Sequence, residues 1–235
     1  MRELRLALAD GVDVAAALHT PHRGTGSRAP VLLFPGARGD HAAAHLVAVA
    51  EVLAAAGHPV VRAALSPRPP GSGIPGPAER QLGRARSVLE AARDLVDAPT
   101  GNWILGGASY GGRVASLTVA DATGRAIGVS GLILIAYPLH PPGRPERLRV
   151  AHFGDIDVPV VLLVGDRDPF FTPDLWRASQ SAFTVPVTAL VVPGGRHDLA
   201  VSARSAPDGI TRTPSEAVAT HADALVDWSA ARHDG

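Results

Sequence analysis

The sequence predicts an α/β protein of one domain, in which helices flank a mostly parallel, doubly wound sheet. Three observations support this prediction. Short apolar runs are continuous rather than alternating, which is typical of strands buried on both faces of a parallel sheet. Helical patterns separate these runs from residue 30 onward. The alternation of strand and helix then continues without a break in composition through the 235 residues.

The predicted strands begin with an antiparallel edge pair, because the segments ELRLAL and VDVAAALHT near the N-terminus alternate in polarity. Three later runs are short, rich in β-branched residues and bounded by Gly or Pro: Pro30–Gly36, Gly131–Pro138 and Val158–Asp166. Three more have the same character in weaker form: His58–Leu65, Asn102–Ser109 and Val187–Gly195. We therefore expect an edge pair followed by six parallel strands.

Apolar residues at helical spacing occupy most of the segments between these runs. The predicted helices are His41–Ala56, Ala78–Val96, Arg113–Asp121, Pro173–Ser181 and Ser215–Ala231. Thr172 suits the N-cap of the fourth helix, which has a proline at its start. Two stretches without periodicity, Ser66–Pro77 and Leu139–Asp157, are predicted to be surface loops. The second is too short to hold a large lid domain.

Composition excludes several classes of function. The 22 basic residues balance 22 acidic residues, so no field of one sign attracts nucleic acid or anionic lipid. The sequence has no Cys, which excludes thiolate nucleophiles and Cys-ligated metals, and no Lys, which excludes a Schiff base. No apolar run is long enough to span a membrane, and the N-terminal residues make a poor signal peptide. A cytoplasmic protein is expected.

The stretch GGASYGG contains the pattern G-x-S-x-G between a predicted strand and a predicted helix. This is the context required for a nucleophile elbow, a tight turn that raises the hydroxyl of Ser109 above the sheet. Gly107 and Gly111 leave room for the turn, and the helix that begins at Tyr110 aims its N-terminal amides at the same point. The spacing does not match a dinucleotide fingerprint, and the missing Lys excludes a Walker loop, so no cofactor is expected.

A serine nucleophile on such a sheet needs an acid and then a histidine base later in the chain. Asp166 and Asp168 lie at the end of one predicted strand, and His197 lies just past the end of the next. These are the strand ends at which open α/β sheets place their sites. Asp168 is preferred to Asp166 because it lies further out and can turn its carboxylate across the rim. Ser109, Asp168 and His197 are therefore a candidate catalytic triad.

Five further residues have candidate roles in binding. The backbone amides of Ala37 and Tyr110 are the expected donors of an oxyanion hole, since one follows an early strand and the other follows the serine. Arg38 is either a contact for an anionic substrate or a solvated loop residue. Tyr137 and Phe170 lie at strand ends near the expected substrate pocket and are candidates to line it, and for Phe170 ordinary packing is the alternative.

Two histidines and one arginine could each have either a functional or a structural role. His41 and His45 stand four residues apart, a spacing found in zinc sites, but no third ligand accompanies them. Surface or helix-start histidines are expected instead, and no metal site is predicted. Arg113 is expected to make a structural hydrogen bond or ion pair rather than to contact substrate.

At these residues the sequence resembles the alpha/beta-hydrolase superfamily, and within it the dienelactone-hydrolase-like group. It is most similar to the branch that holds the testis-expressed hydrolase-like proteins and a subunit of a histone-acetylating NSL complex. The segments that carry the resemblance are GGASYGGRVAS, GLILIAYPLHPPGRPERLR, VPVVLLVGDRDPF and GGRHDL, and the match runs from about residue 30 to the C-terminus.

The resemblance implies an alpha/beta-hydrolase fold, with Ser109 as nucleophile, Asp168 as acid and His197 as base. The expected activity is that of a serine esterase or thioesterase acting on a small acyl substrate through an acyl-enzyme intermediate. Because the branch includes a subunit of a complex, the alternative is a non-catalytic interaction module that has kept the fold.

Overall fold

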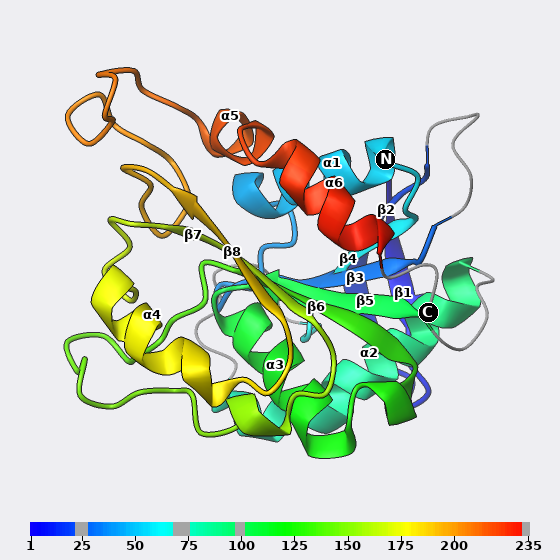
Figure 1. Ribbon diagram of the computed structural model, residues 1–235. Helices are drawn as coiled ribbons and strands as arrows, with labels where there is room; N and C mark the ends of the chain where they lie inside the picture. Colours follow the sequence, from blue (N-terminus) through cyan, green and yellow to red (C-terminus); the bar gives the residue numbers. More distant parts are fainter. Residues whose placement is uncertain (22–27, 68–75, 97–101, 232–235) are drawn as a thin grey trace.

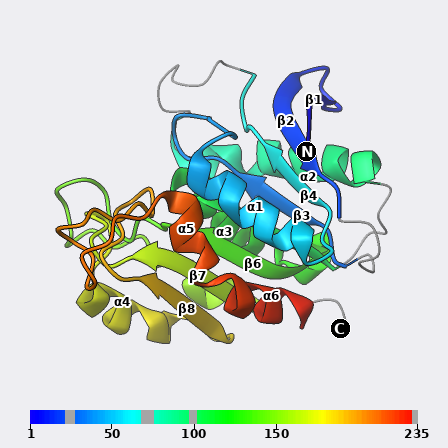
Figure 2. The same ribbon diagram turned by 90° about the horizontal axis from the view of Figure 1, so that it is seen from above.

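The computed structural model describes residues 1–21, 28–67, 76–96 and 102–231, which form one eight-stranded sheet with helices on both faces (Figure 1, Figure 2). Residues 68–75 of the predicted loop Ser66–Pro77 lie outside these ranges. Within them, no helix is long and apolar enough to cross a bilayer.

The sheet has the predicted strands in a doubly wound order. In chain order they are β1 (Arg2–Ala7), β2 (Asp13–His19), β3 (Val31–Phe34), β4 (Val60–Ala63), β5 (Trp103–Ala108), β6 (Val129–Ile135), β7 (Val160–Gly165) and β8 (Val187–Val192). In space the order is β1-β2-β4-β3-β5-β6-β7-β8. β1 pairs with β2 and β2 with β4 in antiparallel fashion, whereas β3 to β8 are mutually parallel. The antiparallel edge pair and the six parallel strands are thus confirmed.

Among the described residues, six α-helices cover the two faces of the sheet. They are α1 (Ala44–Ala55), α2 (Leu82–Val96), α3 (Tyr110–Ala122), α4 (Pro173–Ser179), α5 (Pro214–Ala219) and α6 (Ala222–Ala230). Helices α1, α5 and α6 lie on one face, and α2, α3 and α4 lie on the other (Figure 1). Thr172 caps α4 as predicted, since its Oγ1 accepts a hydrogen bond from the Leu175 amide at 3.2 Å.

Apolar side chains fill both faces of the strands, which explains the continuous runs in the sequence. Along β3, Leu32 and Phe34 join the core beneath α2 and α3, whereas Val31 and Leu33 join the core beneath α1. All four are completely buried. Because successive side chains of a strand point to opposite faces, only a strand covered on both sides has to be apolar at every position.

The C-terminal segment Ser215–Ala231 is not the single helix that its periodicity predicts. The chain breaks at Thr220 and His221, between α5 and α6. Thr220 Oγ1 donates to the Ala217 carbonyl at 2.7 Å, and His221 leaves the helical region with φ −117° and ψ 10°. The His221 ring also bonds the Val191 carbonyl of β8 at 3.1 Å. The contact between His221 and β8 therefore fixes the position at which the helix is interrupted.

The connection from β6 to β7 is a surface loop, as predicted. Its only helical part is the three-residue 3-10 helix Phe153–Asp155. The loop 139–149 nevertheless folds back on itself, because the Arg149 amide donates to the Leu139 carbonyl at 2.7 Å. No lid domain is inserted between these strands.

Candidate active site

The candidate catalytic residues all follow the carboxyl ends of parallel strands. Ala37 lies after β3, Ser109 after β5, Asp168 after β7 and His197 after β8. Because these strands run in the same direction, their carboxyl ends share one edge of the sheet. The topology therefore brings together residues that are far apart in the sequence.

Ser109 occupies the strained turn that the G-x-S-x-G pattern predicts. Its φ of +50° and ψ of −111° lie outside the regions that ordinary residues adopt. A Cβ on Gly107 would lie 2.6 Å from the Phe34 carbonyl oxygen, and one on Gly111 would overlap the carbonyl oxygens of Phe34 and Pro35. Both glycines are thus required for α3 to start directly against the end of β3.

A hydrogen-bonded chain joins the three predicted triad residues. His197 Nδ1 donates to Asp168 Oδ2 at 2.7 Å, because an ionised carboxylate can only accept. The other ring nitrogen, Nε2, is then free to accept from Ser109 Oγ at 2.9 Å. Asp168 is only 3% exposed, and its second oxygen accepts from the Phe170 amide at 2.8 Å.

Two loops held together by their backbones fix this geometry. A Cβ on Gly165 would overlap the backbone of Gly195, so the ends of β7 and β8 approach closely. The Arg167 amide donates to the Gly195 carbonyl at 2.9 Å, which ties the loop of Asp168 to the loop of His197. This close contact therefore helps to position Asp168 and His197 relative to each other.

Asp166, the competing acid, has a different partner. Its Oδ1 accepts from the Gly194 amide at 2.7 Å and so holds the loop that leads to His197. The structure therefore brings Asp168, and not Asp166, to the imidazole. The side-chain carboxylate of Asp166 therefore stabilises the loop by accepting from the backbone amide of Gly194.

The two predicted oxyanion donors lie beside the serine. A Cβ on Gly36 would lie 3.8 Å from the Ser109 Cβ, so the loop that carries Ala37 runs next to the elbow. Tyr110 is the first residue of α3, where a helix leaves its amides without intrahelical acceptors. In the described part of the chain, neither the Ala37 amide nor the Tyr110 amide donates to another backbone group outside the helix.

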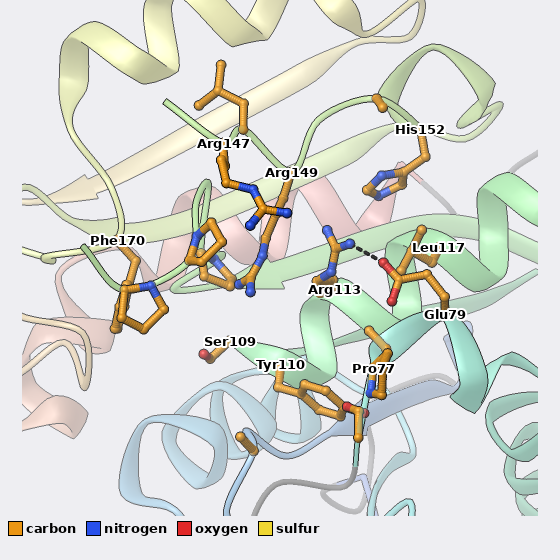
Figure 3. A pocket seen from close by; sticks show the side chains of 18 residues that line it. Pro77, Glu79, Ser109, Tyr110, Arg113, Leu117, Arg147, Arg149, His152 and Phe170 are labelled. Atoms are coloured by element: carbon orange, nitrogen blue, oxygen red, sulfur yellow. Dashed lines mark hydrogen bonds and ion pairs between the residues drawn. The ribbon is translucent and has the colours of Figure 1, made fainter. Parts of the chain in front are cut away.

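Ser109 opens onto two cavities. The first, of about 650 Å³, is shown in Figure 3. The second, of about 800 Å³, is lined by the imidazole of His197. Ala37, Ser109 and Phe170 line both cavities, whereas His197 lines only the second. Ser109 therefore borders a cavity on each of two sides, and only the second of these cavities contains His197.

The predicted binding residues have three different outcomes. Phe170 lies at the cavity wall, with its ring edge-on to His197 at a centroid distance of 4.8 Å. Arg38 is exposed at the second cavity. Tyr137, expected in the pocket, instead lies in the core: it is 1% exposed, and its hydroxyl donates to the Arg149 carbonyl at 2.8 Å. The expectation for Tyr137 was wrong because the backbone at Ala136, with φ +48°, turns the chain at the end of β6.

The two histidines with zinc-like spacing are not on the same helix. His41 precedes α1, and its Nε2 lies 2.9 Å from Glu3 Oε2. His45 lies in α1 and lines the second cavity. Burial, and then the neighbouring His197, lower the pKa of His45 below its ordinary value, which disfavours a second positive charge beside the His197 imidazole. Within the described residues, no cluster of three potential metal ligands occurs.

The sequence reasoning missed the arginines that line the first cavity. Arg147 and Arg149 come from the loop after β6, and Arg113 from α3 (Figure 3). Arg113 makes the predicted ion pair, with Glu79 as partner, but it also lines the cavity. The only signal in the sequence is the basic segment RPERLR, which begins at Arg144, a few residues after the predicted strand Gly131–Pro138, and which does not differ in composition from a solvated loop.

Comparison with known families gives one match over most of the chain. A family model described as "Alpha/beta hydrolase domain" matches residues 27–229, which include the elbow and both loops of the candidate triad.

Solved structures of similar fold extend over nearly the whole chain. The Est1E protein of Butyrivibrio proteoclasticus superposes with a TM-score of 0.73 at 18% identity and covers 99% of each chain. A serine hydrolase without a lid from Xanthomonas campestris gives 0.63 at 20% identity, over 84% of this chain and 86% of that one. A dienelactone hydrolase from Anabaena variabilis gives 0.63 at 18%, over 97% and 95%. These likenesses establish the fold.

Proposed function

Because the chain belongs to the alpha/beta hydrolase family, we propose that it is a serine hydrolase that cleaves a carboxylic ester or thioester of a small acyl substrate. The observation that carries this proposal is the unbroken hydrogen-bonded chain from Ser109 Oγ through His197 to the buried Asp168 carboxylate. Such a chain activates a hydroxyl that is a weak nucleophile on its own.

In the proposed mechanism, Ser109 Oγ attacks the substrate carbonyl carbon while its proton moves to His197 Nε2. Asp168 keeps the imidazole in the tautomer that can accept this proton, and it stabilises the imidazolium that forms. The tetrahedral intermediate collapses when His197 protonates the leaving group, which gives an acyl-enzyme. Water then enters, loses a proton to the same Nε2 and releases the acid, so that the enzyme is restored.

We assign the oxyanion hole to the amides of Ala37 and Tyr110. Both lie next to Ser109, and both are free to turn toward a developing oxyanion. The N-terminus of α3 adds a favourable dipole. One such donor is worth about 3 kcal/mol of transition-state stabilisation in a comparable hydrolase.

The substrate contacts follow from the cavity walls. Phe170 offers an apolar surface between the two cavities, and Arg38 offers a charge at the rim of the second. We also place the chain in the dienelactone-hydrolase-like group, near the testis-expressed and NSL-subunit branch, on the segment YPLHPPGRPERLR. The alternative, a non-catalytic interaction module, fits poorly with an intact triad geometry beside open cavities.

A panel of para-nitrophenyl esters of graded chain length, with acyl-CoA thioesters, tests the proposal. We expect the wild type to hydrolyse short-chain members and the Ser109→Ala variant to be inactive. Wild-type protein that hydrolyses no member, or a Ser109→Ala variant that retains full activity, contradicts the proposed function.

A further inference from the structure

The cavity of about 650 Å³ beside Ser109 has an unusual charge. Three arginines line it, namely Arg113, Arg147 and Arg149, here called the arginine wall. Among the described residues that line it, Glu79 is the only acid. Figure 3 shows the three guanidinium groups gathered on one side of the cavity, across from Ser109 and Tyr110. The cavity therefore carries a net positive charge although the whole chain is neutral.

One member of the arginine wall is only partly satisfied. Arg113 pairs with Glu79 through Nη2. Its other terminal nitrogen, Nη1, is buried and has no acceptor at hydrogen-bond distance in the part of the chain that the structure describes, although the Tyr137 hydroxyl lies near the guanidinium. A buried donor without an acceptor costs free energy, which a bound anion would recover.

Arg149 is the member best prepared to bind an anion. Its amide donates to the Leu139 carbonyl at 2.7 Å, and its carbonyl accepts from the Tyr137 hydroxyl at 2.8 Å, so its backbone is fixed. Its side chain is half-buried, and burial, followed by the neighbouring Arg113, lowers its pKa. Within the described ranges, neither Arg149 nor Arg147 has a carboxylate within ion-pair distance.

The positive charge of Arg113 also affects His152, which lies in the wall of the same cavity. Burial, and then Arg113, lower the pKa of His152 to about 4. Its Nε2 lies 2.8 Å from Ser116 Oγ, so it is held as a neutral ring in the cavity wall. His152 therefore adds no charge, and the anion preference comes from the arginines.

The two cavities at Ser109 also differ in which part of an ester they can hold. His197 must protonate the leaving group, and it lines only the larger cavity. The alcohol or thiol part of the substrate therefore belongs in that cavity. The acyl part then extends toward the arginine wall.

We propose that the arginine wall selects acyl groups that carry a carboxylate at their far end, so that the substrates are monoesters or monothioesters of dicarboxylic acids. The planar guanidinium of Arg149 binds the free carboxylate through two parallel hydrogen bonds, with Arg147 and the unpaired nitrogen of Arg113 beside it. This inference rests on the proposed hydrolase function, which it deepens by naming the substrate class.

A matched pair of substrates tests the charge preference. One is the mono-para-nitrophenyl ester of adipic acid, and the other is its neutral counterpart, in which a primary amide replaces the free carboxylate. Release of para-nitrophenol is measured after subtraction of spontaneous hydrolysis. We expect the wild-type kcat/KM for the acid to exceed that for the amide by about tenfold to a hundredfold, as for the loss of one charged hydrogen-bonded contact.

Variants identify the source of the preference. Arg149→Gln is expected to reduce the acid-to-amide ratio of kcat/KM to near one, and Arg149→Lys to restore part of it. Arg144→Gln is the matched control, because Arg144 is exposed on the same loop but does not line the cavity. A wild-type ratio near one overturns the inference and leaves the proposed function intact, as long as the amide ester is hydrolysed.

A binding measurement tests the arginine wall without catalysis. Calorimetric titration of the Ser109→Ala variant with adipate is expected to detect binding that the additional Arg149→Gln substitution weakens about tenfold or more. Adipate that does not bind, or that binds both variants equally, contradicts the inference. The binding measurement does not depend on catalysis. If no ester is hydrolysed, the proposed function is contradicted, but adipate binding still tests the arginine wall.

Discussion

The substitution Gly111→Ala tests whether the turn at Ser109 depends on the absence of a side chain. An alanine Cβ at this position would lie under 3.0 Å from the carbonyl oxygens of Phe34 and Pro35. These are backbone atoms at the end of β3 and the start of the loop that carries Ala37, so they cannot rotate away. The start of α3 has to move instead.

The magnitude follows from the size of this overlap. Overpacking a tightly packed site costs about 1–3 kcal/mol, and two backbone contacts at once place Gly111→Ala near the upper end, about 3 kcal/mol. In a domain of this size, each kcal/mol lowers Tm by roughly 2–4 °C, so we expect a fall of roughly 6–12 °C. Displacement of the serine from the imidazole should also lower kcat/KM by about a hundredfold.

Gly83→Ala is the matched control. Gly83 is exposed in the first turn of α2, and a Cβ there would meet nothing within 4 Å. Alanine at this helical position should raise the free energy of unfolding by up to about 1 kcal/mol. Thermal and urea unfolding, with the ester assay, measure both variants. A Gly111→Ala protein as stable and as active as Gly83→Ala would refute the steric account of the elbow.

Two further predictions concern the acid residue and the response to pH. Asp168→Asn should lower kcat about ten-thousandfold, the loss known for a triad acid converted to its amide, because the imidazole then favours the wrong tautomer. Asp166→Asn should lower it less than about tenfold, because an amide oxygen can still accept from the Gly194 amide; the reverse order would assign the acid to Asp166. Burial lowers the pKa of both His19 and His152 from 6.5 to about 4. Below pH 6.5 the unfolded chain binds protons that the folded chain does not, so the free energy of unfolding should fall as the pH drops from 6.5 toward 4. Urea titrations across this range should show the loss, and a flat profile in this window would contradict the shifted values.

The positions of the strand ends made the fold and the proximity of the three candidate triad residues predictable from the sequence. Continuous apolar runs identify buried parallel strands, and such strands have to end at one edge of the sheet. Ser109, Asp168 and His197 each follow one of these runs by only a few residues. Their proximity therefore follows from the topology, and no knowledge of the loops is needed.

The conformations of the loops could not be predicted from the sequence. For this reason the expectation that Tyr137 lines the substrate pocket was wrong. Its place at the end of β6 indicates only the edge of the sheet. Whether the side chain faces the cavity or the core depends on the backbone of Ala136, whose positive φ has no sequence signal because alanine rarely adopts it. Likewise, the break between α5 and α6 depends on the contact of His221 with β8.

The arginine wall was missed for a related reason. In sequence, RPERLR in a Pro-rich loop has the composition of any solvated loop. The backbone of Arg149 is bonded to the Leu139 carbonyl and to the Tyr137 hydroxyl, and these tertiary contacts turn the segment back over the cavity. For Arg113, the sequence predicted a structural hydrogen bond or ion pair, and the structure has the pair with Glu79. The sequence did not predict that Nη1 of the same guanidinium would lack an acceptor.

Covalent labelling of the serine tests the central claim most directly. The protein is incubated with a fluorophosphonate, which releases fluoride when an activated serine attacks phosphorus, and then digested with trypsin for mass spectrometry. The tryptic peptide Asp94–Arg113 contains Ser109 as its only serine. We predict one adduct per chain, on Ser109, with no adduct in Ser109→Ala and a much slower reaction in His197→Ala. An unlabelled wild-type protein, or equal labelling of the Ser109→Ala variant, would contradict the account.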